Sequence, residues 1–389
     1  MAERKNIAIF FSYNEAWIGG TYYILSLIHA LNTLTENKKP KLFIVCANDD
    51  EYKIIQKTNY PFLEKKLVSE VNFQGKLTLF DRVINKASKT IFGRYVIEKK
   101  AELNLEQKIN AAFPCPALNT FNDVDKSIFW IPDFQEKHLP EFFNNDEIEK
   151  RNQFSAEIAK KNRSIVFSSN DAANDFNELY TENKCKKAVV PFAVNHPEYT
   201  HLDILLLKQK YQIHQPYFFS PNQFWKHKNH SVIIDAAKIL LEKGIHQFQI
   251  AFSGKESDFR NPEYAHQLKE KVKLLNLENN ILFLGFIDRA EQLQLMNHAI
   301  AVIQPSLFEG WSTVIEDAKS MHQPIVASNL KIHQEQLKHY KSVLFDPTNA
   351  EELASFLEAY LKNQPPKMNN DYASDIKTFA QSFMSFINE

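Results

Sequence analysis

Residues 304–335, QPSLFEGWSTVIEDAKSMHQPIVASNLKIHQE, contain the most informative pattern in the chain. An apolar run of strand length, 300–303, precedes them, and a second apolar run, 324–327, follows a segment with helical periodicity. A strand, a polar turn, a helix and another strand in this order predict one βαβ unit with parallel strands. In parallel sheets ligands bind at the carboxyl ends of the strands, where this polar turn must lie.

Two carboxylates stand at the ends of this turn, Glu309 before it and Glu316 after it. Backbone N–H groups at a helix N-terminus suit a phosphate or another anion. Carboxylates accept hydrogen bonds from hydroxyl-rich molecules such as sugars and ribose. Residues 313–316 also match a capping box, in which Glu316 would satisfy only its own helix terminus. Both interpretations of Glu316 are open on the residues alone.

Short apolar runs alternate with helical patterns along the whole chain. The predicted strands cover residues 7–11, 41–46, 128–131, 164–167 and 188–192, and then 217–220, 248–252, 281–284, 300–303, 324–327 and 343–345. Strands separated by helices predict parallel sheets, and 389 residues are enough for two domains. We therefore predict an α/β fold with two Rossmann-like domains, 1–197 and 198–366. The tail, 367–389, carries apolar residues at helical spacing.

Composition and charge exclude several classes of function. The 46 basic and 47 acidic residues nearly balance, so no long-range field favours nucleic acid. The three cysteines, Cys46, Cys115 and Cys185, are far apart, which argues against a disulfide framework or structural zinc and for a reducing, cytoplasmic setting. No GxGxxG and no GxxxxGK[ST] motif occurs, which counts against dinucleotide oxidoreductases and P-loop NTPases.

Apolar and basic residues alternate over 86–100, a pattern that peripheral membrane proteins use to reach lipid surfaces. Acidic residues dilute the positive charge of this segment, so an ordinary solvated helix is the alternative. Contact with the inner face of a membrane is therefore one expectation. No apolar run approaches the roughly 20 residues of a membrane span.

The segment 305–316, with its Pro-Ser pair, Glu-Gly-aromatic triplet and second glutamate, resembles the signature of family 4 glycosyltransferases of the GT-B fold. The resemblance extends from about residue 217 to residue 346 and, more loosely, over the first domain. It implies that Glu309 contacts the sugar of a nucleotide-sugar donor and Glu316 the ribose. The family has seven residues between the two glutamates, whereas six separate Glu309 from Glu316. The backbone donors implied for the turn are Gly310, Trp311, Ser312 and Thr313.

Residues 221–229, PNQFWKHKN, resemble the family's Arg…Lys element, which neutralises the donor diphosphate. Lys228 falls on the lysine, and Gln223 falls where the arginine is expected. A glutamine donates hydrogen bonds but brings no charge, so one strong phosphate contact is replaced. A solvated basic loop is the alternative for this segment.

Other positions are candidates through the same resemblance. Gly19 and Gly20, which open the first helix, would face the donor phosphates, although a plain tight turn explains them equally well. His138 would stand beside the reacting sugar, with Asp133 as a weaker candidate. Gly254 would line the nucleotide pocket and Phe286 would lie beside the base, where ordinary strand-end residues are the alternative.

The resemblance implies a retaining hexosyltransferase in which His138, Glu309 and Lys228 serve the reaction. Its donor would be a UDP- or GDP-linked sugar and its acceptor a glycan or a lipid-linked molecule, in polysaccharide biosynthesis. The resemblance implies that neither a metal ion nor another cofactor is required, and that the helix 367–389 packs back on the first domain. A non-catalytic GT-B protein that binds nucleotide-sugar or glycan is the alternative. A nucleotide-sugar epimerase is a third alternative, but it would need an acid–base pair at the sugar C2, for which the sequence offers no candidate.

Overall fold

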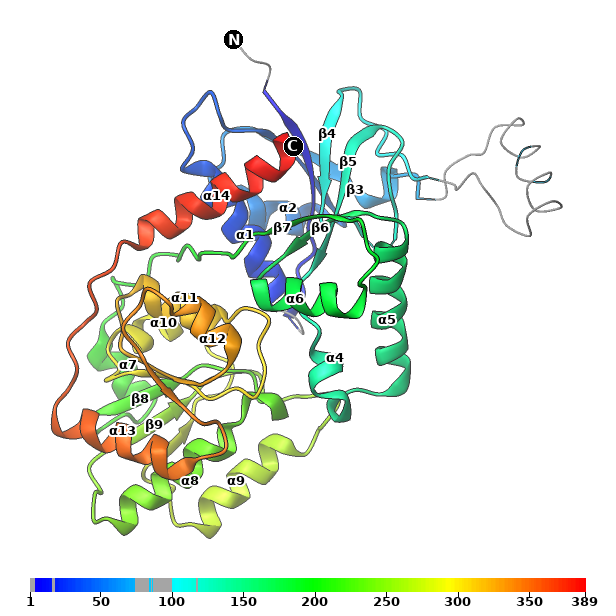
Figure 1. Ribbon diagram of the computed structural model, residues 1–389. Helices are drawn as coiled ribbons and strands as arrows, with labels where there is room; N and C mark the ends of the chain where they lie inside the picture. Colours follow the sequence, from blue (N-terminus) through cyan, green and yellow to red (C-terminus); the bar gives the residue numbers. More distant parts are fainter. Residues whose placement is uncertain (1–3, 16–17, 74–83, 85, 87–99, 117) are drawn as a thin grey trace.

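The computed structural model describes residues 4–15, 18–73, 84, 86, 100–116 and 118–389, and Figure 1 shows two lobes with a helix returning from the second to the first. The first lobe contains a seven-stranded parallel sheet in the order β3-β2-β1-β4-β5-β6-β7. Its strands are β1 (Asn6–Phe10), β2 (Lys41–Cys46), β3 (Leu63–Leu67), β4 (Ile109–Phe113), β5 (Val124–Ile131), β6 (Ser164–Phe167) and β7 (Lys186–Val189). Its helices include α1 (Ile18–Asn32), α2 (Asp49–Gln56), α4 (Gln135–His138), α5 (Asn145–Lys160) and α6 (Asn170–Leu179), with a 3₁₀ turn, η3 (Pro140–Phe142).

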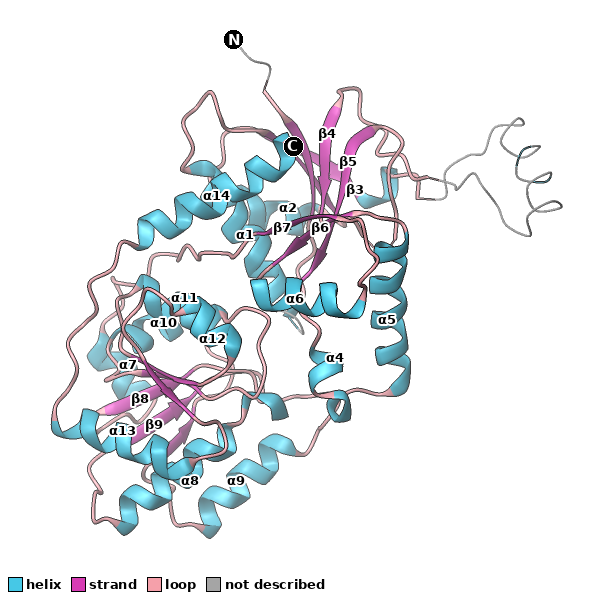
Figure 2. Cartoon of the chain, in the orientation of Figure 1, coloured by secondary structure: helices cyan, strands magenta, loops and turns pink. Residues whose placement is uncertain are grey.

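The second lobe contains a six-stranded parallel sheet in the order β10-β9-β8-β11-β12-β13. Its strands are β8 (Tyr217–Ser220), β9 (Gln249–Phe252), β10 (Ile281–Phe283), β11 (Val302–Gln304), β12 (Ile325–Ser328) and β13 (Val343–Phe345). Its helices are α7 (Ile204–Lys210), α8 (His230–Glu242), α9 (Tyr264–Leu274), α10 (Arg289–Asn297), α11 (Thr313–Ser320), α12 (Lys331–Gln336) and α13 (Ala350–Lys362), with a 3₁₀ turn, η4 (Lys226–Lys228). Figure 2 shows helices on both sides of each sheet. The predicted α/β fold with two parallel sheets is confirmed.

The apolar character of the strands follows from these two covered faces. Successive side chains of a strand point to opposite faces of the sheet. Ile7 and Ile9 of β1 accordingly belong to one buried cluster, and Ala8 between them belongs to another. In the second lobe, Phe218 and Phe219 of β8 divide between two clusters in the same way. Each sheet is thus the middle layer of three.

Two strands of the first sheet were missed by sequence reasoning. β3 reads Leu-Glu-Lys-Lys-Leu and is the edge strand beside β2, a position where charged side chains discourage further pairing. β4 reads Ile-Asn-Ala-Ala-Phe and is buried between β1 and β5, although alanine and asparagine are poor strand formers. The strand predicted at 188–192 is present, but it runs from Lys186 to Val189.

The last helix, α14 (Tyr372–Asn388), packs on the first lobe beside α1, as Figure 1 shows in red and blue. Its buried aromatic side chains, Phe379, Phe383 and Phe386, join the cluster that covers one face of the first sheet. The Phe383 ring lies 5.1 Å from that of Phe113 on β4. The core of the first lobe is therefore completed by the last residues of the chain.

Among the described residues, no helix has both the length and the apolar character needed to cross a membrane. The basic segment considered for membrane contact, 86–100, lies outside the described residues except at its two ends.

The packing of α14 gives a test of the first lobe's core. Replacing the fully buried Phe383 (F383A) should lower the free energy of unfolding by about 3–5 kcal/mol, because the substitution leaves a cavity beside β4. Gln381→Ala, on the exposed face of the same helix, is the matched control. Urea titration followed by circular dichroism measures both variants. Equal stability of the two would contradict this role of α14.

Candidate functional site

The two lobes meet through the segments that follow the carboxyl ends of their strands. From the first lobe come residues after β1, β5 and β6, and from the second lobe residues after β8, β9, β11 and β12. Parallel sheets place these ends on one edge, which is the edge where ligands bind. The candidate site residues after β8 and β11 lie on this shared edge.

The carboxylate of Glu309 is the centre of a polar cluster in the loop after β11. Its Oε1 atom accepts hydrogen bonds from Lys228 Nζ at 2.6 Å, Gln304 Nε2 at 2.7 Å and Ser306 Oγ at 2.6 Å. The residue is only 8% exposed, so the lysine compensates a charge that water reaches poorly. Within the described part of the chain no donor is found for Oε2. That oxygen keeps its acceptor capacity for a ligand hydroxyl.

Lys228 is held in place by the backbone of η4. Asn229, in the left-handed region at φ 56°, ends this turn and donates from Nδ2 to the carbonyls of Pro305 and Pro347. The carbonyl of His227 accepts a hydrogen bond from Leu307 N at 2.7 Å. These bonds tie the loop after β8 to the loop after β11. The sequence analysis assigns Lys228 to the diphosphate and Glu309 to the sugar. In the structure the two side chains form an ion pair and so act as one unit.

Glu316, in the first turn of α11, is 1% exposed and fully engaged inside the protein. Its oxygens accept hydrogen bonds from Gln336 Nε2 at 2.8 Å, Tyr372 Oη at 2.7 Å and Lys319 Nζ at 3.1 Å. Burial raises the pKa of Glu316 above its ordinary value. The Tyr372 hydroxyl also accepts from the amide of Val194 in the segment that links the lobes. The carboxylate thus connects α11 with α14 and, through Tyr372, with that linker. The N-cap of α11 is Ser312, and not Thr313 as the capping box at 313–316 would require.

The neighbouring Asp317 was not considered from the sequence. Its Oδ1 atom accepts from the Arg289 guanidinium at 2.6 Å and contacts His196 Nε2 at 3.0 Å. Burial would raise the pKa of this carboxyl, but Arg289 and His196 outweigh it, so the pKa lies below its ordinary value. Seven residues separate Glu309 from Asp317, which is the family interval that Glu316 misses by one. This interval of seven residues is the sequence signal that could have identified Asp317.

The turn between Glu309 and α11 packs directly on the first lobe. A side chain at Gly310 would place its Cβ 2.7 Å from the carbonyl oxygen of Pro132, so only glycine fits this approach. Trp311 donates from its indole N–H to the carbonyl of Phe192 at 3.1 Å. The amide of Ser312 is already bound to Gln336 Oε1, and Thr313 is the first residue of α11. Residues 310–313 were expected to bind phosphate through their amides. The amide of Ser312 donates to Gln336 instead.

The remaining donor-side candidates lie along the same edge. Gln223 donates from Nε2 to the carbonyl of Glu15 in the first lobe, at 3.3 Å. Gly254 touches the loop after β8, because an added Cβ would lie 2.2 Å from the carbonyl oxygen of Asn222. Phe286, in the loop after β10, is 65% exposed. Gly19 and Gly20 form the first turn of α1.

His138 lies at the end of α4 and faces the second lobe. Its ring stacks on that of Phe308, the neighbour of Glu309, with 5.3 Å between the ring centres. Its Nε2 atom is 2.7 Å from Asp175 Oδ2 on α6. Asp133 accepts a hydrogen bond from Arg151 at 2.7 Å, a partner that sequence reasoning did not identify. The structure therefore places His138 in contact with Phe308, the residue that precedes Glu309.

A further contact between the lobes involves the N-terminus of α6. The carboxylate of Glu335, on α12, accepts hydrogen bonds from the amides of Asn170 at 2.9 Å and Asp171 at 3.2 Å. A carboxylate at a helix N-terminus is favourable because it satisfies free N–H groups and the helix dipole. The two lobes are in contact in this structure. No group of three or more His, Cys, Asp or Glu residues suited to hold a metal ion is found among the residues described.

Comparisons with known proteins agree with this architecture. Residues 205–378 match the family model for glycosyl transferases group 1. The structure is similar to that of a glycosyltransferase from Rickettsia africae ESF-5, with a TM-score of 0.63 and 16% identity over 99% of this chain and 96% of that one. No curated protein shows significant sequence similarity to the chain.

Two other solved structures share the fold over nearly their whole length. HepE from Anabaena, solved in complex with UDP, gives a TM-score of 0.62 at 16% identity and covers 99% of both chains. WaaG, a glycosyltransferase involved in lipopolysaccharide biosynthesis, gives 0.58 at 12% identity over 96% of this chain and 95% of that one. At these identities the similarity establishes the fold. The chain therefore has the GT-B fold, and its second lobe is similar to the glycosyl transferases group 1.

Proposed function

We propose that the protein is a retaining, family 4 glycosyltransferase that moves a hexose from a nucleotide-diphosphate sugar to a glycan or a lipid-linked acceptor. The observation that carries the proposal is the Lys228–Glu309 pair at the edge where the lobes meet. A UDP-linked donor is favoured over a GDP-linked one, because the similar HepE was solved with UDP and with UDP-glucose.

The reaction needs stabilisation of a diphosphate that leaves with an additional negative charge. Lys228 supplies a fixed positive charge, and the N-terminus of α11 supplies backbone N–H groups beside Gly310 and Trp311. In the proposed step the bond between the sugar C1 and the phosphate oxygen breaks. The acceptor oxygen forms the new bond to C1 on the same face, and its proton passes to the departing phosphate.

Glu309 and His138 have positioning tasks in this proposal. The unpartnered Oε2 of Glu309 accepts a hydrogen bond from a sugar hydroxyl, while Oε1 remains bound to Lys228. His138 contacts the transferred sugar from the first lobe, since its ring already lies against Phe308. Closure of the lobes brings the two groups together and excludes water, which would otherwise compete with the acceptor.

A non-catalytic protein that binds nucleotide-sugar or glycan is the second candidate. It is favoured by Gln223, which stands at the position of the family's phosphate-binding arginine and is bound to the first lobe instead. Gln223 brings no positive charge to replace the arginine. Release of free nucleotide by the pure protein separates the two candidates.

Lys228→Ala should reduce transfer from UDP-glucose by at least 100-fold, because the leaving diphosphate loses its positive charge. Gln223→Ala is the comparison, since that residue brings no charge. Nucleotide release is measured by a coupled assay, and thermal unfolding checks that both variants fold. Full activity of a folded Lys228→Ala protein would refute the diphosphate assignment.

Chelation should leave the activity unchanged. In the proposed mechanism Lys228 and the α11 N-terminus perform the electrostatic task that a divalent cation performs in other enzymes. UDP-glucose turnover is compared before and after dialysis against EDTA. Loss of activity that Mg²⁺ or Mn²⁺ restores would show that a metal ion takes part.

The two adjacent carboxylates of α11 should differ in their effect on nucleotide binding. The interval of seven residues from Glu309 and the partly exposed Arg289 favour Asp317 over Glu316 as the ribose ligand. Asp317→Asn should weaken UDP binding by about 1–3 kcal/mol, roughly 5- to 150-fold. Glu316→Gln should instead lower the unfolding temperature, because its partners Lys319 and Tyr372 are buried. Calorimetry with UDP decides, and the opposite ranking would restore the first assignment to Glu316.

A further inference from the structure

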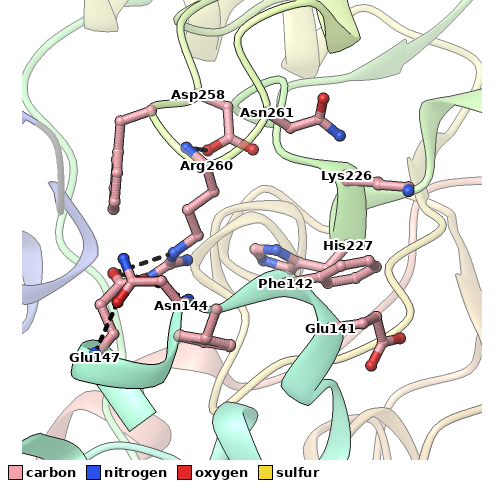
Figure 3. A pocket seen from close by; sticks show the side chains of 11 residues that line it. Glu141, Phe142, Asn144, Glu147, Lys226, His227, Asp258, Arg260 and Asn261 are labelled. Atoms are coloured by element: carbon pink, nitrogen blue, oxygen red, sulfur yellow. Dashed lines mark hydrogen bonds and ion pairs between the residues drawn. The ribbon is translucent and has the colours of Figure 1, made fainter.

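A cavity of about 350 Å³ lies in the seam between the lobes. Figure 3 shows its walls, with Phe142 and His227 among the lining residues and Arg260 reaching toward Glu147. The first lobe contributes η3 and the start of α5. The second lobe contributes η4 and the loop of residues 258–261. Neither lobe forms the cavity alone, and the site described above does not use it.

The cavity adjoins the reaction site along both walls. Lys226 lines the cavity, and Lys228, two residues further, holds Glu309. Phe142 lines the opposite wall, and His138, four residues before it, stacks on Phe308. Four residues of extended chain span at most about 14 Å. A molecule whose one end reacts beside Glu309 can therefore place its next units in the cavity.

Aromatic rings give the cavity faces suited to sugars. Phe259 is 68% exposed although it is a large apolar residue, and it lines the cavity together with Phe142. The C–H bonds on one face of a pyranose ring carry partial positive charge and are attracted to the negative face of an aromatic ring. An exposed phenylalanine in a concave site is thus a candidate platform for such a ring.

The polar groups of the cavity match hydroxyl groups. Asp258 is 6% exposed, and its Oδ1 atom accepts one hydrogen bond, from the amide of Arg260 at 3.0 Å. The side-chain amides of Asn144 and Asn261 both donate and accept, as a sugar hydroxyl does. Acceptors and donors are therefore available around the aromatic rings.

The charge of the cavity argues against an anionic ligand. Three carboxylates, Glu141, Glu147 and Asp258, face two cationic groups, Lys226 and Arg260. Arg260 is already paired with Glu147 at 3.3 Å and lies over the Phe143 ring at 4.1 Å. Burial lowers the pKa of His227 well below its ordinary value, so this ring is neutral at neutral pH. A phosphate or carboxylate would enter a site with an excess of negative charge.

We propose that this cavity binds a neutral sugar unit of the acceptor, next to the unit that carries the attacking hydroxyl. The acceptor is then an oligosaccharide or the glycan part of a lipid-linked molecule. This inference rests on the proposed transfer reaction and specifies its second substrate. Because both lobes build the cavity, binding of the acceptor stabilises the closed arrangement in which Glu309 and His138 come together.

The test uses the full-length protein and an array of immobilised oligosaccharides, neutral ones and ones bearing phosphate or carboxylate groups. The wild type should retain neutral oligosaccharides, and Phe259→Ala should lower their retention at least fivefold. Leu274→Ala is the matched control, since Leu274 is 80% exposed on α9, away from the cavity. It should behave as the wild type. Thermal unfolding confirms that both variants are folded.

Retention that is independent of Phe259, retention of anionic oligosaccharides only, or no retention by a wild-type protein that binds UDP would each overturn the inference. UDP affinity and UDP-glucose turnover of the wild type are measured separately and test the proposed function. Phe259-dependent retention by a protein that binds no nucleotide would support the cavity as a glycan site and refute the transfer reaction.

Discussion

Glu309 carries a negative charge at a place that water barely reaches, and three donors meet on one of its oxygens. Removing Lys228 would leave that charge uncompensated, and removing Glu309 would release the lysine from its position. The pair therefore holds two loops in fixed relation, one after β8 and one after β11. The other groups of the site are arranged around these loops, since Gln304 also bonds to Asn222 and Gly310 follows Glu309 directly.

Closure of the lobes depends on small contacts spread along one edge. Gly310 approaches the backbone of Pro132, Trp311 bonds to Phe192, and Glu335 binds the start of α6. Each contact has one partner on each lobe. Interfaces of this kind between domains permit relative motion. The site is complete only when the lobes are together. A substrate that contacts both lobes therefore shifts the equilibrium toward the closed arrangement and so completes the site.

The fold could be predicted from the sequence because buried parallel strands consist of apolar runs, and segments with helical periodicity separate them. Sequence reasoning missed β3, whose lysines suit an edge, and β4, whose alanines are buried on both faces of the sheet although alanine is a poor strand former. Glu309 and Lys228 each lie in a recognisable motif and were predicted as site residues, and the structure places them in contact. Contacts between distant segments, such as Arg289 with Asp317 or Arg151 with Asp133, leave no local pattern. They arise from the placement of whole elements and become visible only in three dimensions.

Adjacent residues on α11 point to different parts of the molecule. The partners of a carboxylate on this helix therefore depend on whether it stands at position 316 or at position 317. Successive positions of a helix differ by about 100°, so Glu316 and Asp317 cannot face the same partner. Glu316 holds Tyr372, which in turn binds the linker at Val194, whereas Asp317 holds Arg289 at the start of α10. Neighbouring residues of one helical turn thus contact α14, and through it the linker, on one side and Arg289 of α10 on the other. A change in the position of α11 on ligand binding would act on α14 through Glu316, and on the linker at Val194 through Tyr372.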